Sequence, residues 1–213
     1  MALTAGAAWL NTAFAAFDER ITLAVHSLYE SCGGWITPIM EFISLLGKGG
    51  IFLILLSLVL LLCRPTRRMG TAMIIGLSVG ALLVNLWLKV VIARPRPYAD
   101  AESIYYSLWL LLGSHTESDF SFPSGHTNAA FAAMLPLFLL GKKNWSWLAL
   151  IFGILMGISR IYLVVHFPSD VLGGMITGIL SGVLGTLIAL RLPKKWYDWD
   201  LKKGSVRKGG AHL

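Results

Sequence analysis

Residues 159–170 read SRIYLVVHFPSD and interrupt a long apolar region with an arginine, a histidine and a carboxylate. Arg160 ends one apolar run, and Pro168 suits the first turn of a second helix because its missing N–H needs no partner there. We therefore expect a hinge between two helices, with His166 in the hinge. Asp170 could accept a hydrogen bond from one imidazole nitrogen and leave the other free as a nucleophile. The alternative is an arginine and a histidine at a lipid headgroup interface.

The composition is typical of a membrane protein. Of 213 residues, 56% are hydrophobic and 14% are charged, which is far from the balance of a soluble domain. We expect an all-α, polytopic membrane helical bundle. A net charge of +7 would suggest nucleic acid in a soluble protein, but here the basic residues lie mainly in short loops and the tail, where they set membrane orientation. No basic-aromatic pattern indicates nucleic-acid binding, and no pattern specifies an oligomeric state.

Five apolar stretches are candidates for crossing a bilayer, which takes about 20 helical residues. They run over about 35–63, 69–93, 124–140, 145–165 and 168–190. The first exceeds one crossing and is interrupted by Lys-Gly-Gly at 48–50, so it is either a tilted helix or a broken one. Gly174, Gly178 and Gly182 recur at every fourth position, which favours the close approach of another helix in lipid.

The chain divides into three regions. Residues 1–34 mix apolar and charged residues, so we expect a helical segment lying on the membrane surface, with a sixth crossing as the alternative. Residues 35–190 form the membrane domain, and residues 191–213 form a basic tail. The basic turns at 64–68 and 142–143 fall on the same side as the tail, and the positive-inside rule makes that side cytoplasmic. The hinge then faces the extracytoplasmic side of the plasma (inner) membrane.

Two further clusters reach the same face as the hinge. Lys89 lies near the end of its apolar stretch, where an unpaired ammonium costs up to about 2.5–3.5 kcal/mol at mid-bilayer, and Arg96 follows it. Ser124 can cap the next helix, and the free N–H groups at Gly125 could bind an anion. His126 is then placed for proton transfer. Alone, each cluster fits a capped helix end or a headgroup contact; together they predict a pocket that processes an anion.

These clusters resemble the three-part signature of the type-2 phosphatidic acid phosphatase superfamily of lipid phosphatases. The resemblance covers about residues 35–190 and rests on three motifs in order: Lys89-x6-Arg96-Pro97, Pro123-Ser124-Gly125-His126, and Ser159-Arg160-x5-His166-x3-Asp170. It implies that His166 attacks phosphorus to form a phosphohistidine, that Asp170 orients it, and that His126 transfers protons to the leaving group and from water. It also implies a set of phosphate-binding groups: Lys89, Arg96, Ser124, Gly125 and Arg160.

No metal cofactor is expected. Phosphoryl transfer depends mostly on positioning and charge stabilisation, and fixed cations in a site of low dielectric can supply both. The sequence has no carboxylate cluster suited to magnesium, and its one Asp-x-Asp, at 198–200, lies in the tail.

The implied activity is hydrolysis of a phosphomonoester or diphosphate of a membrane lipid. Candidate substrates are undecaprenyl diphosphate, phosphatidylglycerophosphate and phosphatidate. Two alternatives stay open: a lipid phosphotransferase on the same scaffold, and a non-catalytic lipid-binding membrane protein. A haloperoxidase is disfavoured because those relatives are soluble.

Overall fold

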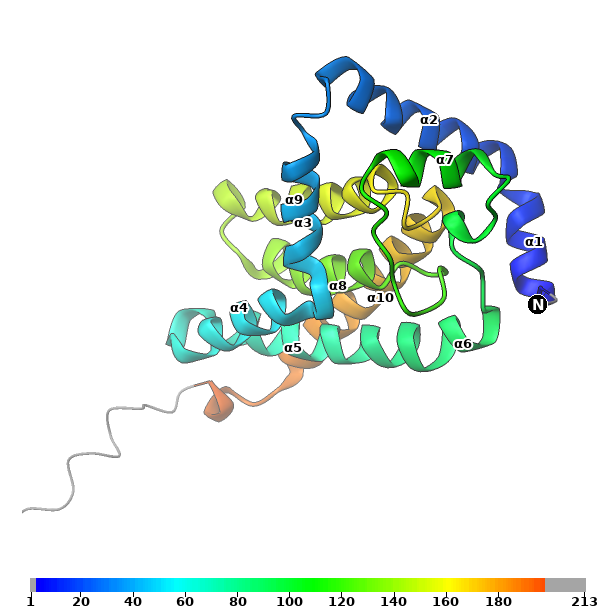
Figure 1. The fold of residues 1–213 in the computed structure, drawn as a ribbon. Helices are drawn as coiled ribbons and strands as arrows, with labels where there is room; N and C mark the ends of the chain where they lie inside the picture. Colours follow the sequence, from blue (N-terminus) through cyan, green and yellow to red (C-terminus); the bar gives the residue numbers. More distant parts are fainter. Residues whose placement is uncertain (1–2, 198–213) are drawn as a thin grey trace, which may run out of the picture.

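The structure is a computed structural model that describes residues 3–197. Within this range the chain forms helices and connecting loops and no strand, so the all-α prediction is confirmed (Figure 1). Helix α10 packs closely against α5 and α8, and α8 packs against α9. The α-helices in chain order are α1 (Ala5–Ala13), α2 (Ala15–Cys32), α3 (Thr37–Gly47), α4 (Ile51–Leu62), α5 (Arg67–Ala81), α6 (Lys89–Ile92), α7 (Ile104–Leu111), α8 (Gly125–Leu140), α9 (Lys143–Tyr162) and α10 (Pro168–Arg191).

Four helical stretches are long and apolar enough to cross a membrane. They are Thr37–Leu62, Arg64–Ala99, Lys143–Tyr162 and Pro168–Arg191, and the apolar helix α8 is shorter. Many large apolar side chains on these helices are exposed, as suits a surface in contact with lipid. The helical membrane architecture agrees with the expectation from sequence, while the count of five crossings stays a prediction.

The first of these stretches is broken, which decides between the two alternatives for residues 48–50. A short 3₁₀ turn, η1 (Lys48–Gly50), separates α3 from α4, and the chain changes direction there (Figure 1). Gly49 and Gly50 have φ values of 61° and 67°, which residues with a Cβ rarely adopt. The break therefore depends on the Gly-Gly pair.

The glycines of α10 allow the close helix packing that their spacing predicts. A Cβ on Gly174 would lie 2.5 Å from the Ser124 carbonyl oxygen, and one on Gly178 would lie 2.6 Å from that of Asn128. Both distances are too short for real atoms, so α10 can approach α8 this closely only without these side chains. The prediction of close packing is confirmed.

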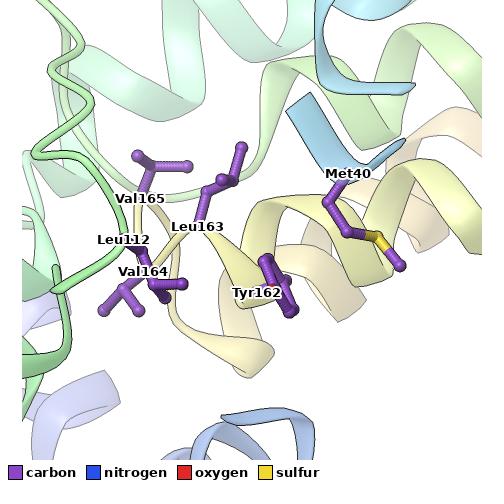
Figure 2. Packing of buried hydrophobic residues seen from close by; sticks show 6 residues of the cluster. All are labelled: Met40, Leu112, Tyr162, Leu163, Val164 and Val165. Atoms are coloured by element: carbon purple, nitrogen blue, oxygen red, sulfur yellow. The ribbon is translucent and has the colours of Figure 1, made fainter. Parts of the chain in front are cut away.

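Helix α9 ends at Tyr162, three residues before the boundary expected from hydropathy. Val164 has a φ of 53°, and the Val165 N–H donates to the Arg160 carbonyl oxygen, so the chain leaves the helix before the apolar run ends. These apolar side chains then pack into a cluster at the hinge instead of continuing the helix. Figure 2 shows its buried members: Met40, Leu112, Tyr162, Leu163, Val164 and Val165.

The N-terminal region forms two helices that pack onto the rest of the chain. Helix α1 contacts α6, and α2 contacts α9 and α10. The helical character of the N-terminal region agrees with the expectation, and the position of this region at the membrane surface stays a prediction. Of the predicted tail, residues 191–197 are described, whereas residues 198–213, including the Asp-x-Asp at 198–200, lie outside the described residues.

Candidate active site

The hinge between α9 and α10 places His166 against the guanidinium of Arg96. The imidazole is buried, and its nearer nitrogen, Nε2, lies 3.0 Å from Arg96 Nη1. Because a guanidinium only donates hydrogen bonds, Nε2 accepts and the ring proton is on Nδ1. Burial, followed by the charges of Arg96 and Arg160, holds the pKa of His166 well below its usual value. The imidazole is therefore neutral, which is the form that a nucleophile requires.

Asp170 lies one helical turn beyond His166 and is completely buried. Its Oδ2 is 3.6 Å from His166 Nδ1, which is longer than a hydrogen bond. The carboxylate instead accepts hydrogen bonds from Arg94 Nη1 at 2.7 Å, Ser121 Oγ at 2.5 Å and the Phe167 N–H at 2.9 Å. Asp170 thus ties the start of α10 to Arg94 and Ser121. That it also orients the imidazole of His166 stays a prediction.

Arg94 lies buried behind the hinge, where two carboxylates share it. Its Nη2 is 2.9 Å from Asp18 of α2, and its Nη1 is 2.7 Å from Asp170. Asp18 also accepts hydrogen bonds from the Ser169 N–H at 2.7 Å and Oγ at 2.8 Å. The N-terminal helices therefore hold both the arginine and the start of α10.

Carboxylates of the loop between α7 and α8 pair with the cations that the motifs predict to bind phosphate. Lys89 Nζ is 2.5 Å from Asp119 Oδ2, Arg96 pairs with the other oxygen of Asp119, and Arg160 pairs with Glu117. All three cations are buried. Burial opposes ionisation of Asp119, but hydrogen bonds and charges of Lys89 and Arg96 outweigh it and lower the carboxyl pKa. The loop therefore neutralises the proposed anion site.

The start of α8 has the geometry that its sequence predicts. Ser124 caps the helix: its Oγ accepts hydrogen bonds from the Thr127 N–H at 3.4 Å and the Thr127 hydroxyl at 3.0 Å. At Gly125 a Cβ would meet no atom closer than 3.5 Å, with Lys89 Nζ at 4.0 Å. The helix N-terminus and a lysine thus border the same space, as an anion site requires.

A cavity of about 270 Å³ joins most of these groups. Arg160 lines a second cavity of about 490 Å³, which also contains His126. Ser124 and Asp170 line neither cavity and lie buried behind the walls. The first cavity therefore brings together five of the predicted site residues: Lys89, Arg96, Gly125, His126 and His166.

Four residues of this arrangement were not predicted as site residues: Asp18, Arg94, Glu117 and Asp119. The sequence carries only weak signals for them. Arg94 stands two residues before Arg96, and the two loop carboxylates precede Ser124 by seven and five residues. Asp18 is an acidic residue in a mixed segment, and nothing in the sequence indicates its distant partner.

No group of three His, Cys, Asp or Glu side chains within residues 3–197 is arranged to hold a metal ion. The expectation of a metal-independent reaction stays a prediction.

Comparison with known proteins identifies the fold and its family. The family model of the PAP2 superfamily matches residues 66–194. This chain belongs to the PAP2 superfamily. It is similar to the crystal structure of a transmembrane PAP2-type phosphatidylglycerolphosphate phosphatase from Bacillus subtilis, with a TM-score of 0.68, 29% identity and coverage of 89% of this chain and 92% of the other.

Two curated relatives in this superfamily carry the name undecaprenyl-diphosphatase. One, from Sulfolobus acidocaldarius, is 30% identical over 78% of this chain and 77% of its own length. The other, from Bacillus subtilis, is 35% identical over half of this chain and 51% of its own length. These relatives are named as phosphatases of membrane lipids. All three motifs of this chain lie within the residues that the family model matches.

The buried pair of Asp18 and Arg94 leads to a stability prediction. Replacing Asp18 by Ala leaves Arg94 with one carboxylate in a buried site, and breaking a buried ion pair costs about 3–5 kcal/mol. Thermal unfolding in detergent micelles measures the loss. The matched control is Glu19→Ala, because Glu19 is adjacent and exposed and its change should cost less than about 0.5 kcal/mol. Equal melting temperatures for the two variants would contradict this account.

Proposed function

We propose that this protein is an integral membrane phosphatase that removes phosphate from a membrane lipid through a phosphohistidine on His166. Undecaprenyl diphosphate, phosphatidylglycerophosphate and phosphatidate are the candidate substrates. The observation that carries the proposal is that His126 and His166, which are far apart in sequence, line one cavity together with Lys89 and Arg96. The names of the PAP2 relatives support the same substrate class.

The first chemical step transfers the phosphoryl group to the enzyme. Arg96 turns from Nε2 of His166 to a phosphoryl oxygen, which frees the Nε2 lone pair. Nε2 of neutral His166 then attacks phosphorus, and the bond between phosphorus and the leaving oxygen breaks. His126 enters this step as the imidazolium, which the negative charge of the bound substrate stabilises. It gives its proton to that oxygen, a contribution typically worth about 10²–10⁴ in rate. Before this step, the substrate phosphate displaces Asp119 and Glu117 from the cations.

The second step releases phosphate. His126, now neutral, takes a proton from water as the water oxygen attacks the phosphohistidine, and the phosphorus–nitrogen bond breaks. Lys89, Arg96 and Arg160 stabilise charge on the phosphoryl oxygens in both steps, together with the N–H groups at Gly125. Ser124 acts as the cap that presents those N–H groups, and Asp170 keeps the hinge in position.

The proposed orientation places the site on the extracytoplasmic side. Figure 1 has the α4–α5 and α8–α9 turns at one end of the bundle and the α9–α10 hinge at the other. Both turns are basic, with Arg64, Arg67 and Arg68 in the first and Lys142 and Lys143 in the second. The positive-inside rule makes their end cytoplasmic.

Purified protein tests the proposal directly. It should release phosphate from at least one of undecaprenyl diphosphate, phosphatidylglycerophosphate and phosphatidate without an added acceptor and in the presence of a chelator. His166→Ala should lose activity on every substrate, and acid-labile ³²P should label the wild type but not the variant. The matched control is His115→Ala, because His115 pairs with Glu41 and lines only the second cavity.

Other results would select the alternatives. Phosphate release that requires an alcohol acceptor would identify a phosphotransferase. Binding of the lipids without any turnover would identify a lipid-binding protein. Loss of activity on chelation would overturn the metal-independent mechanism.

The lowered pKa of His166 predicts the acid side of the pH profile. Protonation inactivates the nucleophile, and because the folded-state pKa lies well below 6.5, this loss occurs only below that pH. The midpoint of the acid limb of kcat/KM should therefore lie well below pH 6.5. The acid limb is measured with two substrates whose phosphate pKa values differ. A midpoint that is the same for both belongs to the enzyme, and one that moves with the substrate belongs to the phosphate. A fixed limb at or above pH 6.5 would contradict a neutral, buried His166.

Asp119 should compete with inorganic phosphate. Replacing Asp119 by Asn removes the charge that pairs with Lys89 and Arg96, so product inhibition by phosphate should strengthen by about two- to fivefold. Because the pKa of Asp119 is lowered, the wild-type competition should persist at pH 5. The control Asp100→Asn changes an exposed carboxylate on the connection between α6 and α7 and should leave the inhibition constant unchanged. Unchanged inhibition in Asp119→Asn would show that the carboxylate does not occupy the phosphate site.

A further inference from the structure

Lys48 is a cation of the cavity that the family signature does not include. It lines both the first and the second cavity. Lys89 and Arg96 already share Asp119, and Arg160 is paired with Glu117. The Lys48 ammonium, by contrast, has no hydrogen-bond or ion-pair partner among residues 3–197; only its backbone is bonded, with the N–H donating to the Leu45 carbonyl oxygen and the carbonyl accepting from the Ile51 N–H. Lys48 thus supplies an unpaired positive charge to a cavity whose other cations are paired with carboxylates.

The break between α3 and α4 is what brings Lys48 to the cavity. Gly49 and Gly50 hold the left-handed turn, and Gly47 packs so closely on His126 that a Cβ would lie 2.7 Å from its ring. An ionisable side chain inside an apolar membrane stretch is costly and usually marks a functional site. Snorkelling toward headgroups would explain a lysine at a helix end, but it does not explain an exposed lysine that lines both cavities in which His126 also lies.

The opposite wall of the cavity changes in polarity along one helical face. Lys89, Asn85, Ala81 and Leu77 all line the cavity and follow one another in steps of four residues, which places them on one side of the helix. The order is a cation, an amide and two apolar side chains. Ile54, one turn into α4, adds a further apolar contact. One end of this face therefore suits an anionic group, and the other end suits a hydrocarbon chain.

Asn85 lies within a π-helical turn, Leu82–Leu88. Such turns are rare and occur frequently at functional sites. The Asn85 side chain is exposed to the cavity and has no hydrogen-bond partner among the described residues. Asn85 thus lies between the phosphoryl end of the cavity and its apolar end, and the Lys48 ammonium is a second unpaired polar group that lines the same cavity.

We propose that Lys48, with Asn85, binds the second phosphate of a lipid diphosphate, the one that stays on the lipid. This inference rests on the proposed function and narrows its substrate class to diphosphates. In such a substrate the second phosphate lies between the reacting phosphorus and the chain. Asn85 occupies this position on the helical face, and Lys48 supplies an unpaired cation to the same cavity. The positive N-terminal end of α4 begins directly after the turn and favours the same anion.

This contact has a specific consequence for the reaction. When His166 takes the terminal phosphoryl group, the bond to the bridging oxygen breaks and its electron pair stays on the lipid monophosphate. Negative charge therefore grows on the leaving group, and Lys48 stabilises that charge in the transition state. A lipid monophosphate has no second phosphate, so its leaving group gains nothing from Lys48.

Two variants of Lys48 and two substrates test the inference. Lys48→Gln and Lys48→Met should lower kcat/KM for undecaprenyl diphosphate about ten- to hundredfold, the loss expected for one charge-assisted contact. Turnover of undecaprenyl monophosphate should change by less than about twofold. Lys48→Arg should retain most of the preference for diphosphate. The control is Lys143→Gln, since Lys143 is exposed at the far end of α9 and donates to the Phe138 carbonyl oxygen.

Each outcome bears on a different claim. Wild-type protein that releases phosphate from none of undecaprenyl diphosphate, phosphatidylglycerophosphate and phosphatidate overturns the proposed function, and this inference with it. Activity on either of the last two without activity on undecaprenyl diphosphate overturns this inference alone. Wild-type activity with an unchanged diphosphate-to-monophosphate ratio in both Lys48 variants overturns the inference alone. Equal losses on both substrates, in variants whose melting temperatures match the wild type, would assign Lys48 to the reacting phosphoryl group and likewise overturn it.

Discussion

Four buried cations lie at one end of an apolar helix bundle, and each needs a carboxylate partner. Lys89, Arg94, Arg96 and Arg160 are all less than a tenth exposed, and an unpaired charge in such a place costs several kcal/mol. The pairing therefore determines which other segments must be present. The loop between α7 and α8 supplies the partners on the cavity side, and α2 and α10 supply them behind the hinge. The arrangement of chain around the hinge follows from this requirement.

The same pairing separates two roles among neighbouring arginines. Arg94 and Arg96 are two residues apart, but Arg94 points to the carboxylates that hold α10, whereas Arg96 contacts the imidazole of His166. One arginine is thus structural and the other faces the cavity. In the proposed reaction, a substrate phosphate replaces the loop carboxylates without disturbing the buried pair behind them.

The parts of the fold that the sequence predicted are those set by local signals. The hinge at His166, the cap at Ser124 and the glycine face of α10 each follow from residues within one or two turns of each other. The partners of the cations were not predicted, because Asp18 and Arg94 are separated by 76 residues and many carboxylates in the sequence could have met that need. The early end of α9 was missed because the apolar residues after Tyr162 fill a cluster at the hinge, which hydropathy cannot distinguish from a membrane helix.

The contact of Asp18 with both Arg94 and Ser169 has a consequence for biosynthesis. A ribosome delivers α2 first, Arg94 next and α10 after both, so of its two carboxylate partners Arg94 has only Asp18 until α10 has been made. The segment that carries the imidazole can take its place only after that step. The reactive centre therefore cannot form before α10 has been made, and chains that stop short of α10 lack it.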